Sequence, residues 1–408
     1  MKKNYLGLDV LRGLGLFSVI TLHTAFYYYD GIYDLDLNDP PLIITIIGFL
    51  LMFAGMFAMI SGLVHTLQAY RKIKEKGFSY KNTFKYALFA GLYILLIAYL
   101  YFLVTAPGII HFDTRSMDNS FLVELIKEGN ILFPSIDRIL YIDSLVMIGS
   151  NIILVSLATI VGFKLIKSDS KRSYYFYLLA VAVLLLSIVR IPLYSTYLDA
   201  RDNGNYFVVL LLNWFVNKNN PILPFYAFGL FGAWVATLLI EGNVKKTRIQ
   251  VLTSGIVILV IGVIIYVTAE ETMLDRLIDY TWYGIMIMQI GLFKLIILLF
   301  LKLYKNKESY KETNILSRFL YRFGIAGLTV FFIEQVFSSL LKEIFRLIDG
   351  NLFLELYPSV VIGLVIAFIW GVLLKVWSKY NYKYGVEYFY TVLMNKYGGS
   401  EKRNKLEE

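Results

Sequence analysis

The chain contains no cysteine and only three histidines among its 408 residues. The absence of cysteine excludes disulfides, cysteine-based metal sites and an enzyme intermediate carried as a cysteine thioester. Three histidines without cysteine also argue against a histidine-based metal centre. Charged residues are scarce at 17%, whereas hydrophobic residues make up 58% of the chain. These proportions are typical of a polytopic membrane protein, and we expect one helical bundle in a lipid bilayer.

The net charge of +9 does not indicate nucleic-acid binding. The lysines and arginines gather in short connectors between apolar segments, where they mark the topology of a membrane protein. The N-terminal sequence MKKNYLGLDVLRG lacks a small-residue cleavage site, and a long apolar run follows it. We therefore interpret this run as an uncleaved anchor.

The hydropathy pattern predicts an all-α fold with about ten membrane-spanning helices. The expected spans are 8–29, 42–65, 84–106, 138–163, 174–195, 222–241, 250–268, 279–303, 317–341 and 356–378. The 66–85 connector is rich in lysine and arginine, whereas the 30–41 connector has neither. The positive-inside rule then places both termini in the cytoplasm. We expect a membrane domain over 1–395 and a disordered cytoplasmic tail over 396–408.

Two connectors on the predicted outer side are longer than simple turns require. The segment 107–137 contains His111, and the segment 196–221 contains the apolar stretch YFVVLLLNWF. An apolar run this short favours an interfacial or re-entrant helix over a spanning one. Because long loops are often functional, we expect recognition of an acceptor molecule here.

The first span carries three ionisable residues, Asp9, Arg12 and His23. Arg12 and His23 are eleven positions apart, about three helical turns plus 20°, so they share one face and lie roughly 16 Å apart along the axis. Ionisable groups inside a bilayer usually face a bundle interior or a watery cavity. One interpretation is structural, with a snorkelling arginine and a hydrogen-bonded histidine. The other is a polar channel with a cation at its cytoplasmic entrance and a titratable imidazole near its far end.

Gly48, Gly55 and Gly62 recur every seven residues in the second span, with Ser61 beside the last. Such a stripe of small residues favours close helix packing over a ligand-facing role, and both hold if the stripe packs on the first helix beside a channel. Further charges fall inside predicted spans: Asp143, Arg190, Lys294 and Glu334. Each should have a partner in the bundle. Glu334 lies about twelve residues past Arg322, at a depth similar to that of His23, so it is the second functional candidate.

Several segments resemble the transmembrane acyltransferase superfamily. LDVLRG followed by an R-x10-H spacing resembles the superfamily's opening motif, and MFAMISGLV (56–64) resembles its second helix. NPILPFYAFGLFGAW (220–234) and FLYRFGIAGLTVFFIEQVF (319–337) resemble helices of the heparan-α-glucosaminide N-acetyltransferase-like branch. WSKYNYKYGVEYFYTVL (377–393) resembles the aromatic C-terminal segment of the YeiB-like proteins. The heparan-type enzymes differ in taking their catalytic histidine from the first outer loop, so the subfamily and the acceptor stay open.

The resemblance implies helices around a pore, with acyl-CoA entering from the cytoplasm and the acyl group passing to a surface glycan. His23 and Glu334 are then the catalytic candidates, with His23 as general base in a direct transfer. The donor, acetyl-CoA, would contact residues chosen from Arg12, Asp9, Ser61, Arg71, Lys72 and Arg322. No metal is expected. The implied location is the plasma membrane, and a homodimer is compatible with these features.

Two other functions stay open at this point. Buried charges also serve ion-coupled transporters and translocases of lipid-linked sugars. A broken helix at the midplane and symmetric halves would favour these, and the sequence shows no clear sign of either. A membrane protein that has lost catalysis and acts as a partner subunit is the third.

Overall fold

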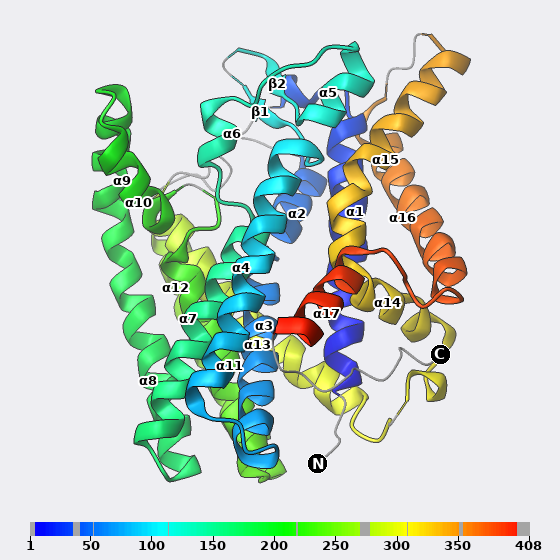
Figure 1. Cartoon of the computed structure of the whole chain (residues 1–408). Coiled ribbons are helices and arrows are strands. Elements are labelled where there is room, and N and C mark those ends of the chain that lie inside the picture. Colours follow the sequence, from blue (N-terminus) through cyan, green and yellow to red (C-terminus); the bar gives the residue numbers. More distant parts are fainter. Residues whose placement is uncertain are drawn as a thin grey trace. The chain divides into compact units, whose positions relative to one another are not determined.

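The computed structural model describes residues 5–35, 41–51, 53–112, 114–217, 219–269, 278–307, 309–350 and 354–397. The described chain is mostly helical, and its contacts divide it into two compact units. The first unit comprises Met1–Met52, Ile97–Tyr141 and Leu303–Glu408, and the second comprises Phe53–Leu96 and Ile142–Lys302. Helix α4 (Tyr80–Val104) contributes to both. Most of the described residues lie in helices (Figure 1).

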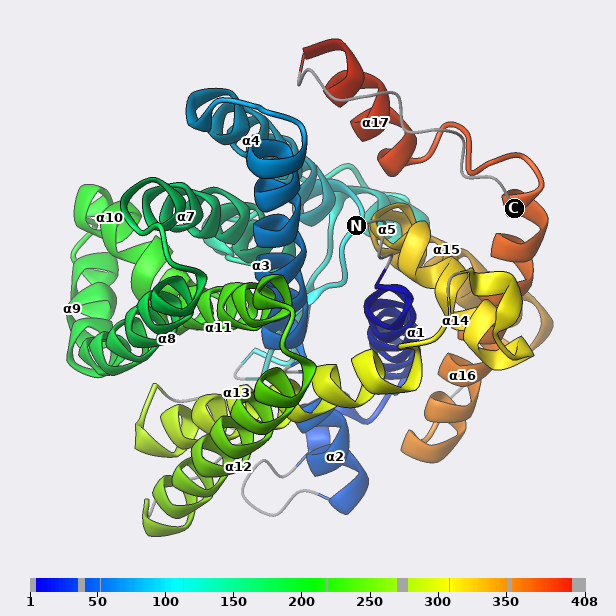
Figure 2. The ribbon, with the colours of Figure 1, turned by 90° about the horizontal axis from the view of Figure 1, so that it is seen from below.

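The first unit is built around α1 (Leu6–Tyr28), which packs against α14, α15 and α16. Figures 1 and 2 both show these helices side by side. The unit's helices are α1, α2 (Leu42–Leu51), α5 (Phe121–Glu128), α6 (Ile136–Leu140), α14 (Ile315–Ile325), α15 (Gly327–Ile348), α16 (Leu356–Ser378) and α17 (Val386–Tyr397), with short 3-10 turns at Ile32–Asp34 and Tyr310–Glu312.

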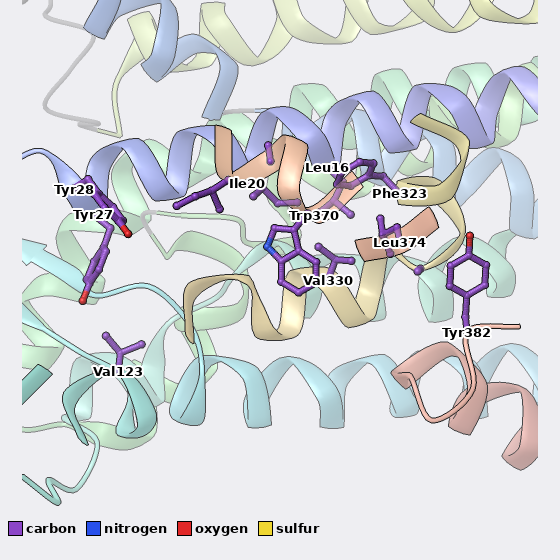
Figure 3. Close-up of a cluster of buried hydrophobic side chains, with 13 residues drawn as sticks. Leu16, Ile20, Tyr27, Tyr28, Val123, Phe323, Val330, Trp370, Leu374 and Tyr382 are labelled. Atoms are coloured by element: carbon purple, nitrogen blue, oxygen red, sulfur yellow. The ribbon is translucent and has the colours of Figure 1, made fainter. Parts of the chain in front are cut away.

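Glycines allow the backbones around α1 to approach closely. A Cβ atom on Gly13 would lie 1.8 Å from the carbonyl oxygen of Leu320, and one on Gly324 would lie 2.1 Å from that of Asp9. Since position 9 meets 324 and position 13 meets 320, α1 and α14 run antiparallel here. A buried apolar cluster fills the space beside this contact, including Leu16, Phe323 and Trp370 (Figure 3).

The second unit is centred on α11, which lies between α3 and α8 (Figure 2). Its helices are α3 (Ala54–Tyr70), a π-helical turn (Arg71–Glu75), α7 (Ser144–Leu165), α8 (Asp169–Leu186), a 3-10 turn (Ser187–Val189), α9 (Arg190–Asp202), α10 (Tyr206–Val216), α11 (Ile222–Glu241), α12 (Val244–Thr268) and α13 (Tyr280–Leu303).

Two glycines of the predicted stripe, Gly55 and Gly62, lie on α3 and pack closely against α11. A Cβ atom on Gly62 would lie 2.0 Å from the carbonyl oxygen of Gly229, and one on Gly55 would meet the ring of Phe228. Gly232 of α11 approaches the carbonyl oxygen of Met59 in the same way. Small residues on both helices permit this contact, and the sequence alone does not identify which partner helix supplies them.

Among the described residues, eight helices are long and apolar enough to cross a membrane, and nine if the bent pair α14–α15 is one span. The predicted multi-pass helical membrane protein is confirmed at this level, with eight or nine such helices among the described residues where the sequence predicts about ten. The predicted span 42–65 divides into α2 and α3, which are both short.

The predicted span 317–341 is not one continuous helix, because α14 and α15 meet at an angle of 87°. The break at Ala326 is flanked by Gly324 and Gly327, which are weak helix formers.

The long connectors contain structure of their own. In 107–137, strands β1 (Ile109–His111) and β2 (Ser116–Asp118) form an antiparallel hairpin. The buried Arg138 donates to the backbone oxygens of Pro107 and Asp118 in this connector, and to that of Phe102 in α4. In 196–221, the predicted short apolar helix is present as α10. Helix α17 reaches Tyr397, and the rest of the predicted tail lies outside the described residues.

Candidate active site on helix α1

The structure brings the two catalytic candidates together, although 311 positions separate them in the chain. The Nδ1 atom of His23 lies 2.7 Å from Oε1 of Glu334, within hydrogen-bonding distance. Glu334 is fully buried in α15, whereas the His23 side chain keeps 22% of its surface exposed. The second carboxylate oxygen, Oε2 of Glu334, is buried and has no hydrogen-bond partner in the described part of the chain. A polar group this buried needs a hydrogen-bond partner, and His23 supplies one.

Aromatic rings border this pair within the same unit. The ring of Phe331, one turn before Glu334, lies 6.0 Å from the His23 imidazole. Tyr101 of α4 packs against Phe331 at 4.7 Å. Apolar walls lower the local dielectric, so they strengthen the interaction between the imidazole and the carboxylate.

Beyond the pair, polar contacts continue along α1 and α15. Thr24 Oγ1 lies 2.9 Å from Ser338 Oγ, and the hydroxyl of Tyr28 donates to the backbone oxygen of Ser338. One turn further, Lys342 donates to the backbone oxygen of Tyr27 at 2.9 Å. In these contacts the residue numbers on α1 and on α15 increase together, so this part of α1 runs parallel to α15.

The polar contacts end at an ion pair beyond the last turn of α1. Lys342 Nζ lies 3.3 Å from Asp30 Oδ1, and Asp30 Oδ2 accepts from the backbone N–H of Leu354. Glu334, Ser338 and Lys342 recur every four residues, which places them on one face of α15. This polar spacing in an apolar helix is visible in the sequence, but our interpretation used only Glu334.

The predicted donor-site residues of the first unit lie on α1 and α14. Arg12 donates to Asp9 at 2.7 Å, and both side chains are partly exposed. Arg322 lies on α14 within the stretch where Asp9 meets Gly324 and Gly13 meets Leu320, and is therefore at the level of Arg12. The Nε atoms of both arginines are buried and have no hydrogen-bond partner in the described residues. Two guanidinium groups from neighbouring helices thus occupy one end of α1, about 16 Å from His23 along the axis.

The other predicted donor-site residues lie in the second unit. Ser61 is half-buried in α3, and Arg71 begins the π-helical turn that follows this helix. Nζ of Lys72 lies over the ring of Tyr86 and is covered. Burial, with a smaller contribution from Lys76, lowers the pKa of Lys72 to about 7. The expected role of Lys72 in donor binding stays a prediction.

The remaining intramembrane charges have structural partners, as expected. Asp143 caps α7 by accepting from the backbone N–H of Val146 at 2.7 Å. Arg190 binds the backbone oxygens of Val216 and Asn217. Lys294 donates to Ser254 Oγ at 2.8 Å.

In the part of the chain that the structure describes, no group of three or more histidine, aspartate or glutamate side chains is arranged to hold a metal ion. No protein-family model matches the chain, and no curated protein shows significant similarity to it. The geometry of His23 and Glu334 therefore carries the functional argument.

Proposed function

We propose that the protein is a membrane acyltransferase that moves an acyl group, most simply acetyl, from cytoplasmic acyl-CoA to an extracytoplasmic acceptor. The acceptor class implied by the sequence resemblance is a sugar of a surface glycan, and the implied location is the plasma membrane with both termini cytoplasmic. The observation that carries the proposal is the hydrogen bond between His23 and the buried Glu334. His23 lies eleven residues beyond Arg12 on α1.

The histidine–carboxylate pair supports general-base catalysis. An ionised Glu334 accepts a hydrogen bond from Nδ1–H of His23, which leaves Nε2 free to accept a proton. His23 would take the proton from an acceptor hydroxyl or amine as that group attacks the thioester carbonyl carbon. Glu334 would stabilise the positive charge on the ring. Collapse of the tetrahedral intermediate breaks the C–S bond, and the CoA thiolate takes the proton from His23.

The phosphate end of the donor would bind near the start of α1, at the level of Arg12. A CoA pyrophosphate and 3′-phosphate need cations, and Arg12 with Arg322 offers two guanidinium groups at one level. The roughly 16 Å from Arg12 to His23 would be spanned by the extended pantetheine arm.

An ion-coupled transporter is the second candidate, and the broken α14–α15 pair favours it. Broken helices with buried carboxylates form the coupling sites of many transporters, and Glu334 lies on α15 just past the 87° bend. A transporter binds and releases its substrate unchanged, so it would not cleave a thioester.

The two functions are separated by following acetyl-CoA and the released thiol with the detergent-purified protein. The chain has no cysteine, so a thiol reagent detects CoA alone. An acyltransferase releases CoA, slowly with water and faster with an acceptor sugar. If there is no thiol release and neither acetyl-CoA nor CoA raises the melting temperature, the proposal fails. Substrate-dependent ion uptake into proteoliposomes would then support the transporter.

A further inference from the structure

The turn between α16 and α17 is held in an unusual backbone conformation. Asn381, Tyr382 and Tyr384 have φ values of 53°, 47° and 67°, in the left-handed region that residues other than glycine seldom adopt. Tyr382 is buried in the apolar cluster of the first unit (Figure 3), and its ring packs edge-on against Trp377 at 5.5 Å. Trp377 Nε1 donates to the backbone oxygen of Lys383 at 3.2 Å. These contacts fix the start of α17.

This turn delivers a buried carboxylate to the beginning of α15. Oε1 of Glu387 accepts from the backbone N–H groups of Leu328 and Thr329 at 2.5 and 3.2 Å. Its Oε2 accepts from the Thr329 hydroxyl at 2.5 Å, and the Thr329 oxygen accepts from Val386 N–H at 2.7 Å. Burial raises the pKa of Glu387, although the hydrogen bonds from Thr329 and the backbone oppose this effect.

The contact stabilises the start of α15 specifically. The first N–H groups of a helix have no partner within it, and a negative charge there is favoured by the helix dipole. The broken end at Ala326 would otherwise leave Leu328 and Thr329 without acceptors in a buried environment. Glu387 therefore caps the first turn of α15, which follows the 87° bend.

The direction of α15 determines whether Glu334 meets His23. Thr329 and Glu334 are five residues apart, or roughly 7.5 Å along the helix axis. A tilt of α15 by about 10° about its first turn, which Glu387 contacts, would move Glu334 by about 1.3 Å. This exceeds the roughly 0.5 Å tolerance of a catalytic hydrogen bond. We propose that Glu387 is a positioning residue, which holds α15 against α1 so that Glu334 contacts His23. This inference rests on the proposed function for its kinetic consequence, but not for its structural one.

The structural consequence can be measured by disulfide formation in this cysteine-free chain. Thr24 Oγ1 and Ser338 Oγ lie 2.9 Å apart on α1 and α15, so Thr24→Cys with Ser338→Cys creates a reporter of the α1–α15 contact. Under a mild oxidant we expect Glu387→Ala to slow disulfide formation at least about fivefold. The matched control is Glu355→Ala, which removes an exposed glutamate at the start of α16.

The kinetic consequence is measured in the protein without the reporter cysteines. Glu387→Ala should lower kcat by about 10²-fold while the KM for acetyl-CoA changes less than about twofold, because a displacement of 1 Å can cost that much in rate. Glu387→Gln keeps one oxygen acceptor for Leu328 N–H and should restore part of both the disulfide rate and kcat. If Glu387→Ala does not fold, Thr329→Val removes the hydroxyl alone and should give the same changes to a smaller degree.

The outcomes separate this inference from the proposed function. In one outcome, Glu387→Ala slows disulfide formation while the wild-type protein shows neither thioesterase nor transferase activity. That result would uphold the positioning role and exclude the acyltransferase. If the wild type is active and the Glu387→Ala variant has the same disulfide rate and kcat as the Glu355→Ala control, the positioning role is overturned. If Glu387→Ala lowers the melting temperature but leaves the disulfide rate and kcat unchanged, Glu387 contributes only to stability. This result would also overturn the positioning role.

Discussion

Replacing Glu334 by glutamine removes the negative charge beside His23 with almost no change in shape. At the observed 2.7 Å and an effective dielectric constant of 20, the gross attraction between unit charges is 332/(20 × 2.7), or about 6 kcal/mol. A neutral hydrogen bond from Nδ1 would recover part of this, so we expect a net loss of roughly 3–4 kcal/mol in the transition state. At 1.36 kcal/mol per factor of ten, kcat should fall by about 10²- to 10³-fold.

The assay is the release of CoA from acetyl-CoA, with Glu343→Gln as the matched control. Glu343 lies on the same helix and pairs with Arg346 at 3.0 Å near the surface, where such pairs contribute little. The control should keep wild-type turnover within about twofold. A Glu334→Gln protein as active as Glu343→Gln would refute the role of the carboxylate.

Three further predictions concern the donor, the helix packing and pH. Arg12→Ala should raise the KM for acetyl-CoA about tenfold or more with a smaller effect on kcat, because it removes a charged hydrogen-bond donor; an unchanged KM would exclude Arg12 from the donor site. Gly62→Ala would place a Cβ atom 2.0 Å from the Gly229 carbonyl oxygen, and should lower the free energy of unfolding by about 1–3 kcal/mol in a thermal or denaturant titration. Burial over the ring of Tyr86 lowers the pKa of Lys72 from 10.5 to about 7. Between these two pH values Lys72 is protonated in the unfolded chain but not in the folded protein, so the free energy of unfolding should rise with pH. Lys72→Met should flatten that rise in melting curves, and an unchanged slope would contradict the buried position of Lys72.

Periodicity and charge in the sequence were enough to find the residues of the candidate site. Arg12 and His23 stand out because charged groups in an apolar helix are costly, and Glu334 stands out for the same reason. Glu334 does lie at the level of His23, 2.7 Å from its ring nitrogen. The chain reaches this level through a bend of 87° at Ala326, however, and not along one continuous helix from Arg322. Two glycines around the bend were the available signal.

The contacts between distant segments could not be predicted. Helical spacing shows that Gly62 needs a close neighbour, but the partner helix α11 is set by the packing of the whole second unit. Nothing in the local sequence connects Glu387 to Thr329, because the contact depends on a strained turn and on the break before α15. The contact of Lys72 with the ring of Tyr86 likewise could not be predicted from the basic connector.

The most direct test of the central claim compares the wild type with His23→Ala in detergent, using acetyl-CoA as donor and following free CoA. The acyltransferase account predicts that the wild type releases CoA, that release increases with an acceptor sugar, and that His23→Ala abolishes it while its melting temperature stays close to that of the wild type. Equal CoA release by the two proteins would contradict the account, since the proton acceptor would then lie elsewhere.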